Sequence, residues 1–469
     1  MSKFQDSNIL NDVRAKYDAL RKFHDSGKTR SYGFRLESLL KLKKAILHHS
    51  DKIEEAITLD FNKPKYETYL SDIGVITDEL NHAIKNLKSW MKPKKVSTSM
   101  AIFPGYISRL HPESKGVVVI FAPWNYPVNL ALIPLIGSVA AGNTVLVKPA
   151  HETSHSAQIV ADIIQSAFSS EHVTTILGEG SSLGPLILDN FRFDHIFFTG
   201  SQSVGKYIMT KAAENLTPVT LELGGKSPAI IDASCHLSNS VNRLVWGKFF
   251  NAGQTCIAPD YLLIHNDIYE KAIPAIIQRI RAVYGENPKN LSHFAKLINK
   301  TRTLKVVSYI SQGEVLYGGN YDLEERYVEP TLILVKDTNL PIMSEEIFGP
   351  VWPILTWKTE DDLLQIIRKN RYPLSCYIYS NSQRLKEFII QNIEFGSGCI
   401  NDNMVQFANK SIPFGGVQYS GFGRYHGKSS FETFSNTKGI VTSLSWFDHP
   451  LKYPPYVNWK KKVSSFFLK

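Results

Sequence analysis

The hydrophobic residues in the first hundred positions recur at the spacing of an amphipathic helix. In the stretch RLESLLKLKKAILHHSDKIEEAITLDF, which begins at residue 35, leucine or isoleucine returns at helix-like intervals. A period of about 3.6 residues places such side chains on one helix face. The sequence therefore predicts helices here, and the first twenty residues read as an amphipathic helix as well. The apolar positions are Leu36, Leu39, Leu40, Ile46, Ile53 and Ile57.

The stretch SMAIFPGYISRLHPES, residues 99–114, breaks this period and is expected to form an extended arm or a hairpin. From residue 116, short apolar runs alternate with helical patterns. Continuous apolar strands separated by helices are typical of a parallel sheet covered on both faces, which binds ligands beyond the carboxyl ends of its strands. The expected strands are 116–122, 143–150, 173–177, 193–200, 218–223 and 227–233, and the expected helices are 128–142, 156–168 and 203–216.

The second half of the chain repeats this alternation, and the sequence therefore predicts a second α/β domain. A chain of 469 residues is long enough for two to three domains. The glycine-containing stretch 178–184 reads as a turn. The expected strands are 261–265, 327–335, 351–357 and 376–380, and the expected helices are 270–284 and 361–370.

Composition changes this picture little. Hydrophobic residues make up 43% and charged residues 20% of the chain, which is ordinary for a globular protein. The four cysteines are widely scattered and form no CxxC pair, so neither a zinc site nor a disulfide framework is indicated, and a reducing compartment fits best. They are Cys235, Cys256, Cys376 and Cys399.

The net charge of +10 comes from basic residues that are mostly dispersed among acidic ones. This pattern argues against nucleic-acid binding, which needs a concentrated basic surface. The N-terminus lacks the apolar segment of a secretory signal, and no uninterrupted apolar run is long enough to span a bilayer. A cytoplasmic location is therefore expected.

A glycine-containing turn in FFTGSQSVGKY lies between an expected strand and an expected helix. Gly200, Gly205 and Lys206 have the spacing of a phosphate-binding P-loop, but Tyr207 stands where that motif needs a small hydroxyl for Mg²⁺. The stretch does not match the dinucleotide pattern GxGxxG either. A helix N-terminus still favours phosphate, while a tight turn without any ligand is the alternative.

Five short motifs carry residues with candidate chemistry. Each has a plain structural alternative, because an asparagine can belong to a turn, a lysine can be solvated, a carboxylate can be paired and a lone cysteine is often a buried small hydrophobe. The motifs are FAPWNYP with Asn125, VKPA with Lys148, LELGGKSP with Glu222, NAGQTCIAPDY with Cys256, and SEEIFGPV with Glu346 and Phe348.

Together, and in this order, these stretches resemble the aldehyde dehydrogenase superfamily from about Tyr32 to about Ser443. NAGQTCIAPDY and PFGGVQYSGFGRYHGKSSFETFS resemble its class 3-like branch, which acts on aliphatic, fatty and aromatic aldehydes. The resemblance implies an α/β fold with a Rossmann-like coenzyme domain at 1–221, whose arm segment is about 97–111. It further implies a catalytic domain at 222–401, and a segment 402–469 that returns to the coenzyme domain and supplies an oligomerisation strand and a C-terminal tail.

The resemblance also implies catalytic roles. Cys256 is expected to add to the aldehyde carbon as the nucleophile, and the Asn125 amide with the Cys256 backbone N–H is expected to hold the developing oxyanion. Hydride would then pass to NAD or NADP, leaving a thioester. Glu222 is expected to activate the water that hydrolyses it. No metal is implied.

The same resemblance assigns coenzyme contacts. Lys148 and Glu346 are expected on ribose hydroxyls, and Phe348 near the nicotinamide ribose. The turn facing the pyrophosphate is expected to consist of Gly200, Ser201 and Gly205.

This sequence departs from the family at residue 151. Members often carry an acidic residue three places after the lysine equivalent to Lys148, where it repels a 2′-phosphate, but here the residue is His151. Histidine cannot repel a phosphate and attracts one when protonated. The sequence predicts use of both NAD and NADP or a preference for NADP. The alternative is that Glu152 moves in and restores a preference for NAD.

The tail YVNWKKKVSSFFLK is predicted to place Trp459, Val463, Phe466 and Phe467 on one face of a helix, with three lysines toward the others. A short basic helix with aromatic residues suits a membrane surface. The alternative is an end that packs on a partner subunit or is disordered.

The resemblance to the class 3-like branch implies a homodimer, although chain length also permits a tetramer. Three other functions compete with aldehyde oxidation. The thioester could pass to coenzyme A or phosphate, or the reaction could run in reverse as an acyl reductase. A nucleotide hydrolase and a non-enzymatic binding protein are the remaining alternatives.

Overall fold

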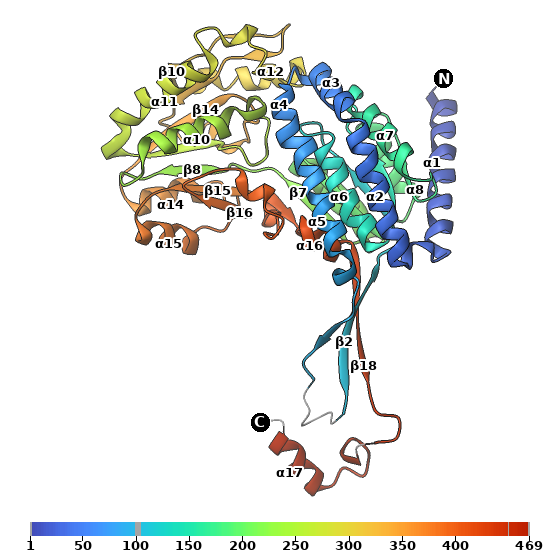
Figure 1. Cartoon of the computed structure of the whole chain (residues 1–469). Coiled ribbons are helices and arrows are strands. Elements are labelled where there is room, and N and C mark those ends of the chain that lie inside the picture. The colour runs from blue at the N-terminus through green and yellow to red at the C-terminus, as the bar shows by residue number, and fades with distance from the viewer. Residues whose placement is uncertain (1, 99–104, 449, 468–469) are drawn as a thin grey trace.

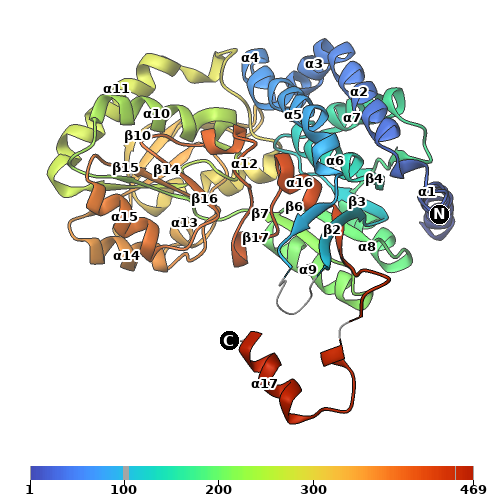
Figure 2. The same cartoon turned by 60° about the horizontal axis from the view of Figure 1, so that its bottom comes forward.

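The structure is a computed structural model that describes residues 2–98, 105–448 and 450–467. The body holds two open sheets side by side, each covered by helices, and a long arm projects from it (Figure 1). The first described helices lie on the outer side of one sheet, and the last described helix lies at the far end of the arm from the body (Figures 1 and 2).

The N-terminal region is helical, as its apolar period predicts. Ser31 caps α2 by accepting from the Phe34 backbone N–H. Leu39, Ile46 and Ile53 are buried, but Leu40 is 47% exposed, so its assignment to the apolar face was wrong. The helices are α1 (Ser2–Asp25), α2 (Tyr32–His48), α3 (Ser50–Phe61), α4 (Lys65–Thr68) and α5 (Gly74–Trp90), with a π-helical turn, η2 (Tyr69–Ile73), between the last two.

The first sheet has the strand order β17-β7-β6-β3-β4-β5 and is parallel except for β17. The predicted strands of this region are confirmed as β3 (Val117–Phe121), β4 (Thr144–Lys148), β5 (Val173–Thr175), β6 (His195–Gly200) and β7 (Val219–Leu223); the short β17 (Gly421–Phe422) joins from far along the chain. The helices are α6 (Asn129–Ala141), α7 (Ser154–Ala167), α8 (Gly180–Asn190), α9 (Gln202–Glu214) and α16 (Gly427–Thr433).

Side-chain alternation along β3 divides the core into two layers. Val118 and Ile120 pack in the cluster formed with α2, α3, α5, α6 and α7. Val117 and Val119 pack on the opposite side with residues of α1, α8 and α9. The stretch 178–184, read as a turn, is largely the start of α8, which begins at Gly180.

The second sheet has the order β10-β13-β14-β9-β8-β15-β16 and is parallel except for β10. The expected strand 327–335 is split at Pro330, which has no N–H for a ladder, into β12 (Tyr327–Val328) and β13 (Thr331–Leu334). The other strands are β8 (Pro228–Ile231), β9 (Tyr261–His265), β10 (Glu314–Tyr317), β14 (Val351–Trp357), β15 (Ser375–Tyr379) and β16 (Ser397–Ile400); β11 (Tyr321–Asp322) pairs with β12 alone. The helices are α10 (Leu237–Phe249), α11 (Tyr269–Tyr284), α12 (Lys300–Val307), α13 (Pro341–Ser344), α14 (Glu360–Arg368) and α15 (Gln383–Asn392).

Strand β7 spans the predicted domain boundary between residues 221 and 222. The chain passes from the first sheet to the second between Leu223 and Pro228. Glu222 therefore lies on the last parallel strand of the first sheet, one residue before that strand ends.

The arm is a three-stranded antiparallel sheet of β1 (Lys94–Val96), β2 (Ile107–Ser114) and β18 (Ser435–Thr442), in the order β1-β2-β18. Part of the predicted arm segment, residues 99–104, lies outside the described residues. The tail is helical as predicted, in α17 (Asn458–Phe467), which lies beyond the arm's tip (Figure 1). Within the described residues, no helix is long and apolar enough to cross a membrane.

Candidate active site

The candidate nucleophile lies in a strained loop between α10 and β9. Three consecutive residues, Asn251, Ala252 and Gly253, have positive φ angles of 52°, 51° and 74°. Such a conformation is uncommon for alanine and needs support from surrounding contacts. A side chain at Gly253 would meet the Gly349 carbonyl oxygen. The loop then leads to Cys256, which is half-buried.

Hydrogen bonds from both sheets hold this loop. Asn125 donates from Nδ2 to the Gln254 carbonyl at 3.1 Å, and Asn251 Nδ2 donates to the Asn125 carbonyl at 2.9 Å. Tyr377 on β15 donates to the Ile257 carbonyl at 2.6 Å. Asn125 is thus brought to the nucleophile loop, with a second amide N–H left for another acceptor.

The thiol of Cys256 is in an environment that disfavours its charge. Burial raises its pKa first, and the Glu346 and Glu222 carboxylates raise it further, while the backbone N–H groups of Cys256 and Ile257 lower it. The thiol is therefore neutral at rest. These N–H groups favour any negative charge that forms at this position.

Glu222 on β7 is 3% exposed, and neither of its carboxylate oxygens has a hydrogen-bond partner among the described residues. Burial raises its pKa well above the ordinary range, and Arg424 only partly offsets this. Gly415 approaches closely, since a Cβ there would lie 3.0 Å from Glu222 Oε1. An unpaired buried carboxyl beside a thiol has capacity for a proton and for a water molecule.

A cavity of about 660 Å³ lies at the carboxyl ends of the strands of the first sheet. Of the predicted coenzyme residues, Lys148, His151, Gly200 and Ser201 line it. Ser201 is the N-cap of α9, so the positive end of that helix faces the cavity. A basic residue, a helix N-terminus and apolar walls suit a phosphate-bearing nucleotide.

Gly205 does not line this cavity. It lies in the first turns of α9, where a Cβ would come within 2.6 Å of Leu223 Cδ2 on β7. Its small size serves the packing of helix on strand, and its contact with a pyrophosphate stays a prediction.

Glu346 lines a second cavity, of about 840 Å³, which shares Ser201 with the first. Its carboxylate lies against Gly224, where a Cβ would collide with it. Burial raises its pKa to about 8, with Asp260 adding to this and the Gly225 N–H and Arg302 opposing it. Because Glu346 also raises the pKa of the Cys256 thiol, the predicted nucleophile and this predicted coenzyme residue lie close together.

Phe348 has a positive φ of 51° and packs edge-on against Trp124, with ring centroids 5.3 Å apart. The Arg302 guanidinium lies 5.8 Å from the Phe348 ring and 5.9 Å from the Trp124 ring. Arg302 was not predicted as a site residue, because it belongs to no motif and reaches the site only through the fold.

His151 is paired with Glu152 at the rim of the first cavity. His151 Nδ1 lies 3.1 Å from Glu152 Oε2, and both residues line the cavity. The negative charge of Glu152 also acts on Lys148, raising its pKa against the larger effect of burial. The family's acidic position is therefore occupied by a histidine whose neighbour supplies the carboxylate. Among the described residues, no cluster could hold a metal ion.

The fold and this site define an oxidoreductase of the aldehyde dehydrogenase type. The model of the aldehyde dehydrogenase family matches residues 6–440. The chain belongs to this family.

Its relatives place it in the class 3-like branch. Homo sapiens aldehyde dehydrogenase family 3 member B1 is 37% identical over 440 residues, covering 93% of each chain. Staphylococcus aureus 4,4'-diaponeurosporen-aldehyde dehydrogenase is 38% identical over 462 residues, covering 98% of this chain and 100% of that one. Rattus norvegicus "aldehyde dehydrogenase, dimeric NADP-preferring" is 37% identical over 451 residues, covering 96% and 98%.

Solved structures agree with this fold. The substrate-bound state of Staphylococcus aureus AldH superposes with a TM-score of 0.93 at 38% identity, covering 97% of this chain and 99% of that one. The NAD+ complex of a Bacillus cereus aldehyde dehydrogenase gives a TM-score of 0.84 at 27% identity, covering 93% and 89%. The predicted α/β aldehyde dehydrogenase fold is confirmed.

Proposed function

We propose that this aldehyde dehydrogenase oxidises an aldehyde to the carboxylic acid through a thioester on Cys256. The observation that carries the proposal is the convergence of three groups from distant segments: the Cys256 thiol, the Asn125 amide and the unpaired carboxyl of Glu222. An NTPase has no support, because Tyr207 occupies the position of the Mg²⁺-binding hydroxyl.

The side chains account for the bond changes. Cys256 Sγ loses its proton to water and adds to the carbonyl carbon, while Asn125 Nδ2 and the Cys256 N–H hold the oxyanion. Bound NAD or NADP would supply the acceptor for the hydride of this carbon, and a thioester would remain on Cys256. Glu222 then takes a proton from the water that attacks the thioester. The carbon–sulfur bond breaks, the carboxylic acid leaves, and the proton held by Glu222 returns to Sγ.

The fit of the coenzyme rests on the two adjoining cavities. Lys148 and Glu346 would hold ribose hydroxyls, Gly200 and Ser201 would face the pyrophosphate, and Phe348 would pack near the nicotinamide ribose. Support comes from the Bacillus cereus NAD+ complex and the NADP-preferring rat relative.

We propose an aliphatic medium- or long-chain aldehyde, or an aromatic one, as the substrate. A largely apolar cavity of about 190 Å³, lined by Leu70, Val75 and Phe407, lies beside α5, and Phe407 and Cys256 pack against the same core cluster. Reduction of NAD and NADP by a panel from acetaldehyde through long-chain aldehydes to benzaldehyde tests the function. Absence of reduction with every aldehyde and both coenzymes would overturn it.

Transfer of the acyl group to coenzyme A, or reverse acyl reduction, is the second candidate. Glu222 argues against it, since a buried and unpaired carboxylate favours water as the acceptor. A purely binding role would not require the thiol, the amide and the carboxylate to converge.

Coenzyme choice is predicted to depend on His151. The protein is expected to use NAD and NADP with kcat/KM values within about a hundredfold, because His151 does not repel a 2′-phosphate. His151→Glu places a carboxylate there and is expected to lower kcat/KM for NADP about tenfold, which corresponds to roughly 1.4 kcal/mol. The kcat/KM for NAD should change little.

The reciprocal variant for this prediction is Glu152→Gln. It removes the neighbouring carboxylate and should raise kcat/KM for NADP relative to that for NAD. Steady-state kinetics with both coenzymes at one pH supply the ratio. A preference for NAD above a hundredfold in the unaltered protein would contradict dual use.

We also propose a homodimer formed through the arm. Strand β18 is an edge of the arm sheet, and its Ile440 and Val441 are exposed. Unprotected apolar edges are typical of partner surfaces. The rat relative named dimeric supports this.

Membrane contact by the tail stays a prediction, as do the cytoplasmic or membrane-peripheral locations. In α17, Trp459 and Val463 are exposed beside Lys460 and Lys461. If the helix binds membranes, the full chain is expected to co-sediment with anionic vesicles and a chain ending before Trp459 is not. Equal pelleting of the two proteins would reject a tail-driven contact.

A further inference from the structure

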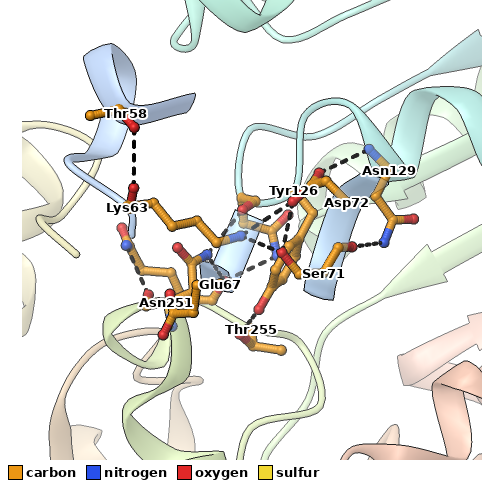
Figure 3. Close-up of polar contacts among 11 residues, drawn as sticks. Thr58, Lys63, Glu67, Ser71, Asp72, Tyr126, Asn129, Asn251 and Thr255 are labelled. Atoms are coloured by element: carbon orange, nitrogen blue, oxygen red, sulfur yellow. Dashed lines mark hydrogen bonds and ion pairs between the residues drawn. The ribbon is translucent and has the colours of Figure 1, made fainter. Parts of the chain in front are cut away.

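A buried polar cluster contacts both ends of segment 251–255, which immediately precedes Cys256 (Figure 3). At one end, the Asn251 backbone N–H points at the Glu67 carboxylate, with distances of 3.4 Å to Oε1 and 3.3 Å to Oε2. At the other end, the Tyr126 hydroxyl lies 2.5 Å from Thr255 Oγ1. The proposed mechanism uses neither Glu67 nor Tyr126.

Lys63 is the centre of this cluster and is 1% exposed. Its Nζ donates to Ser71 Oγ at 2.6 Å and to Asp72 Oδ2 at 3.3 Å, and lies 4.3 Å from the centre of the Tyr126 ring. Ser71 and Asp72 belong to the π-helical turn η2, a form that is rare and often found at functional sites. The cation therefore fixes Tyr126, which in turn holds Thr255.

Asp72 also binds the segment that follows Tyr126. Its Oδ1 accepts from the Asn129 backbone N–H at 3.1 Å, and Asn129 Nδ2 donates to the Ser71 carbonyl at 2.5 Å. The cluster thus connects η2 to the start of α6 and to the nucleophile loop, and Figure 3 marks its hydrogen bonds and its ion pair.

The cluster's charges do not balance. Within it, one cation, Lys63, faces two carboxyl groups, Glu67 and Asp72, of which Asp72 makes the direct ion pair. Two anions with one cation in a buried site favour a proton on one carboxyl. Glu67 is the carboxyl without a direct ion pair.

We propose that Glu67 is a positioning residue for the nucleophile: its carboxylate fixes the left-handed turn Asn251–Gly253, and thereby the direction of the Cys256 thiol. This proposal builds on the proposed function of Cys256. An ionised carboxylate is a stronger acceptor than a neutral group, so it can hold a backbone N–H that starts a strained turn.

The charge state of Glu67 supports this role. Burial raises the pKa of Glu67 to about 7, with Lys63 and the Asn251 N–H opposing the rise. The groups that face it are Lys63, the Tyr126 and Tyr284 hydroxyls, and Asp72 across Tyr126. As the pH falls through about 7, Glu67 gains a proton and its hold on Asn251 weakens.

The same shift has an opposite effect on stability. Because the carboxyl pKa is higher in the folded than in the unfolded chain, folding favours the protonated form, and stability is lost as the pH rises from the ordinary glutamate pKa to about 7. Ionised Glu67 therefore costs stability. A group that only stabilises the fold would not lower stability when it ionises. The stability cost of ionised Glu67 therefore distinguishes a role in reactivity from a structural one.

The test compares the unaltered protein with Glu67→Gln and measures iodoacetamide alkylation of Cys256 by peptide mass spectrometry, which needs no aldehyde. The variant is expected to be alkylated about tenfold more slowly at pH 8. In the unaltered protein the alkylation rate should rise with thiol ionisation and show an additional step near pH 7. The variant should lack this step. Its Tm at pH 8 should be higher. Its kcat should fall while the KM for coenzyme stays unchanged.

Glu37→Gln, on the surface of α2 with Lys41, is the matched control and should leave all four measurements unchanged. An unchanged alkylation rate and pH profile in Glu67→Gln would overturn the proposal, as would slower alkylation with a lower Tm at every pH. If the unaltered protein oxidises no aldehyde but its alkylation still depends on Glu67, the proposed function is overturned and the positioning role stands.

Discussion

Cys256→Ser is expected to lower aldehyde oxidation by about 10⁴-fold or more while leaving coenzyme binding intact. A serine hydroxyl ionises far less readily than a thiol, so the bond to the aldehyde carbon does not form. The Cys256 backbone N–H and the Asn125 amide remain, but they stabilise an oxyanion only once a nucleophile has added. The two cavities assigned to the coenzyme are not lined by Cys256.

Two measurements check this result: steady-state oxidation across the aldehyde panel, and titration of NADH binding by its fluorescence. Cys235→Ser is the matched control. Cys235 is also half-buried, but it comes before α10 in the sequence, whereas the nucleophile loop follows that helix. It should keep full activity. Residual activity above about one per cent in Cys256→Ser would contradict a covalent role for this thiol.

The central strands of the two sheets could be predicted because they are buried on both faces. The edge strands β10 and β16 are partly exposed and were not predicted. The run 117–121 is apolar at every position and 144–148 is apolar at its three central positions, which separates them from the amphipathic helices. β17 and β18 were not predicted as strands of particular sheets. β17 has two residues, and β18 is an exposed edge strand whose pairing with β2 joins residues more than three hundred positions apart.

The candidate site divides in the same way. Residues in compact motifs, such as Asn125 and Cys256, could be proposed from the sequence, and the fold brings them together. Glu67 and Arg302 carry no local signal, since each looks like an ordinary charged residue on a helix. The roles inferred for them depend on contacts across the fold with Asn251 and Phe348, which the order of residues does not reveal.

Glu222→Gln is expected to lower kcat by about 10²–10⁴-fold while preserving one rapid turnover. Gln keeps the volume of the side chain but cannot take a proton from water, so the thioester should form and then persist. A stopped-flow experiment should show a burst of NADH equal to the enzyme concentration, followed by a slow phase. The unaltered protein should show no such burst if hydrolysis is fast.

The pH dependence of this variant separates a base from a structural group. Burial raises the pKa of Glu222 well above its usual range, so the carboxyl is protonated, and inactive as a base, at low pH. Turnover limited by hydrolysis should therefore rise with pH through that raised pKa, and Glu222→Gln should lose this rise. Hydroxylamine attacks thioesters without a base and should restore turnover by releasing the hydroxamate. A variant with neither burst nor rescue would show that Glu222 acts before the thioester forms, and the carboxylate would then belong to thiol activation instead of hydrolysis.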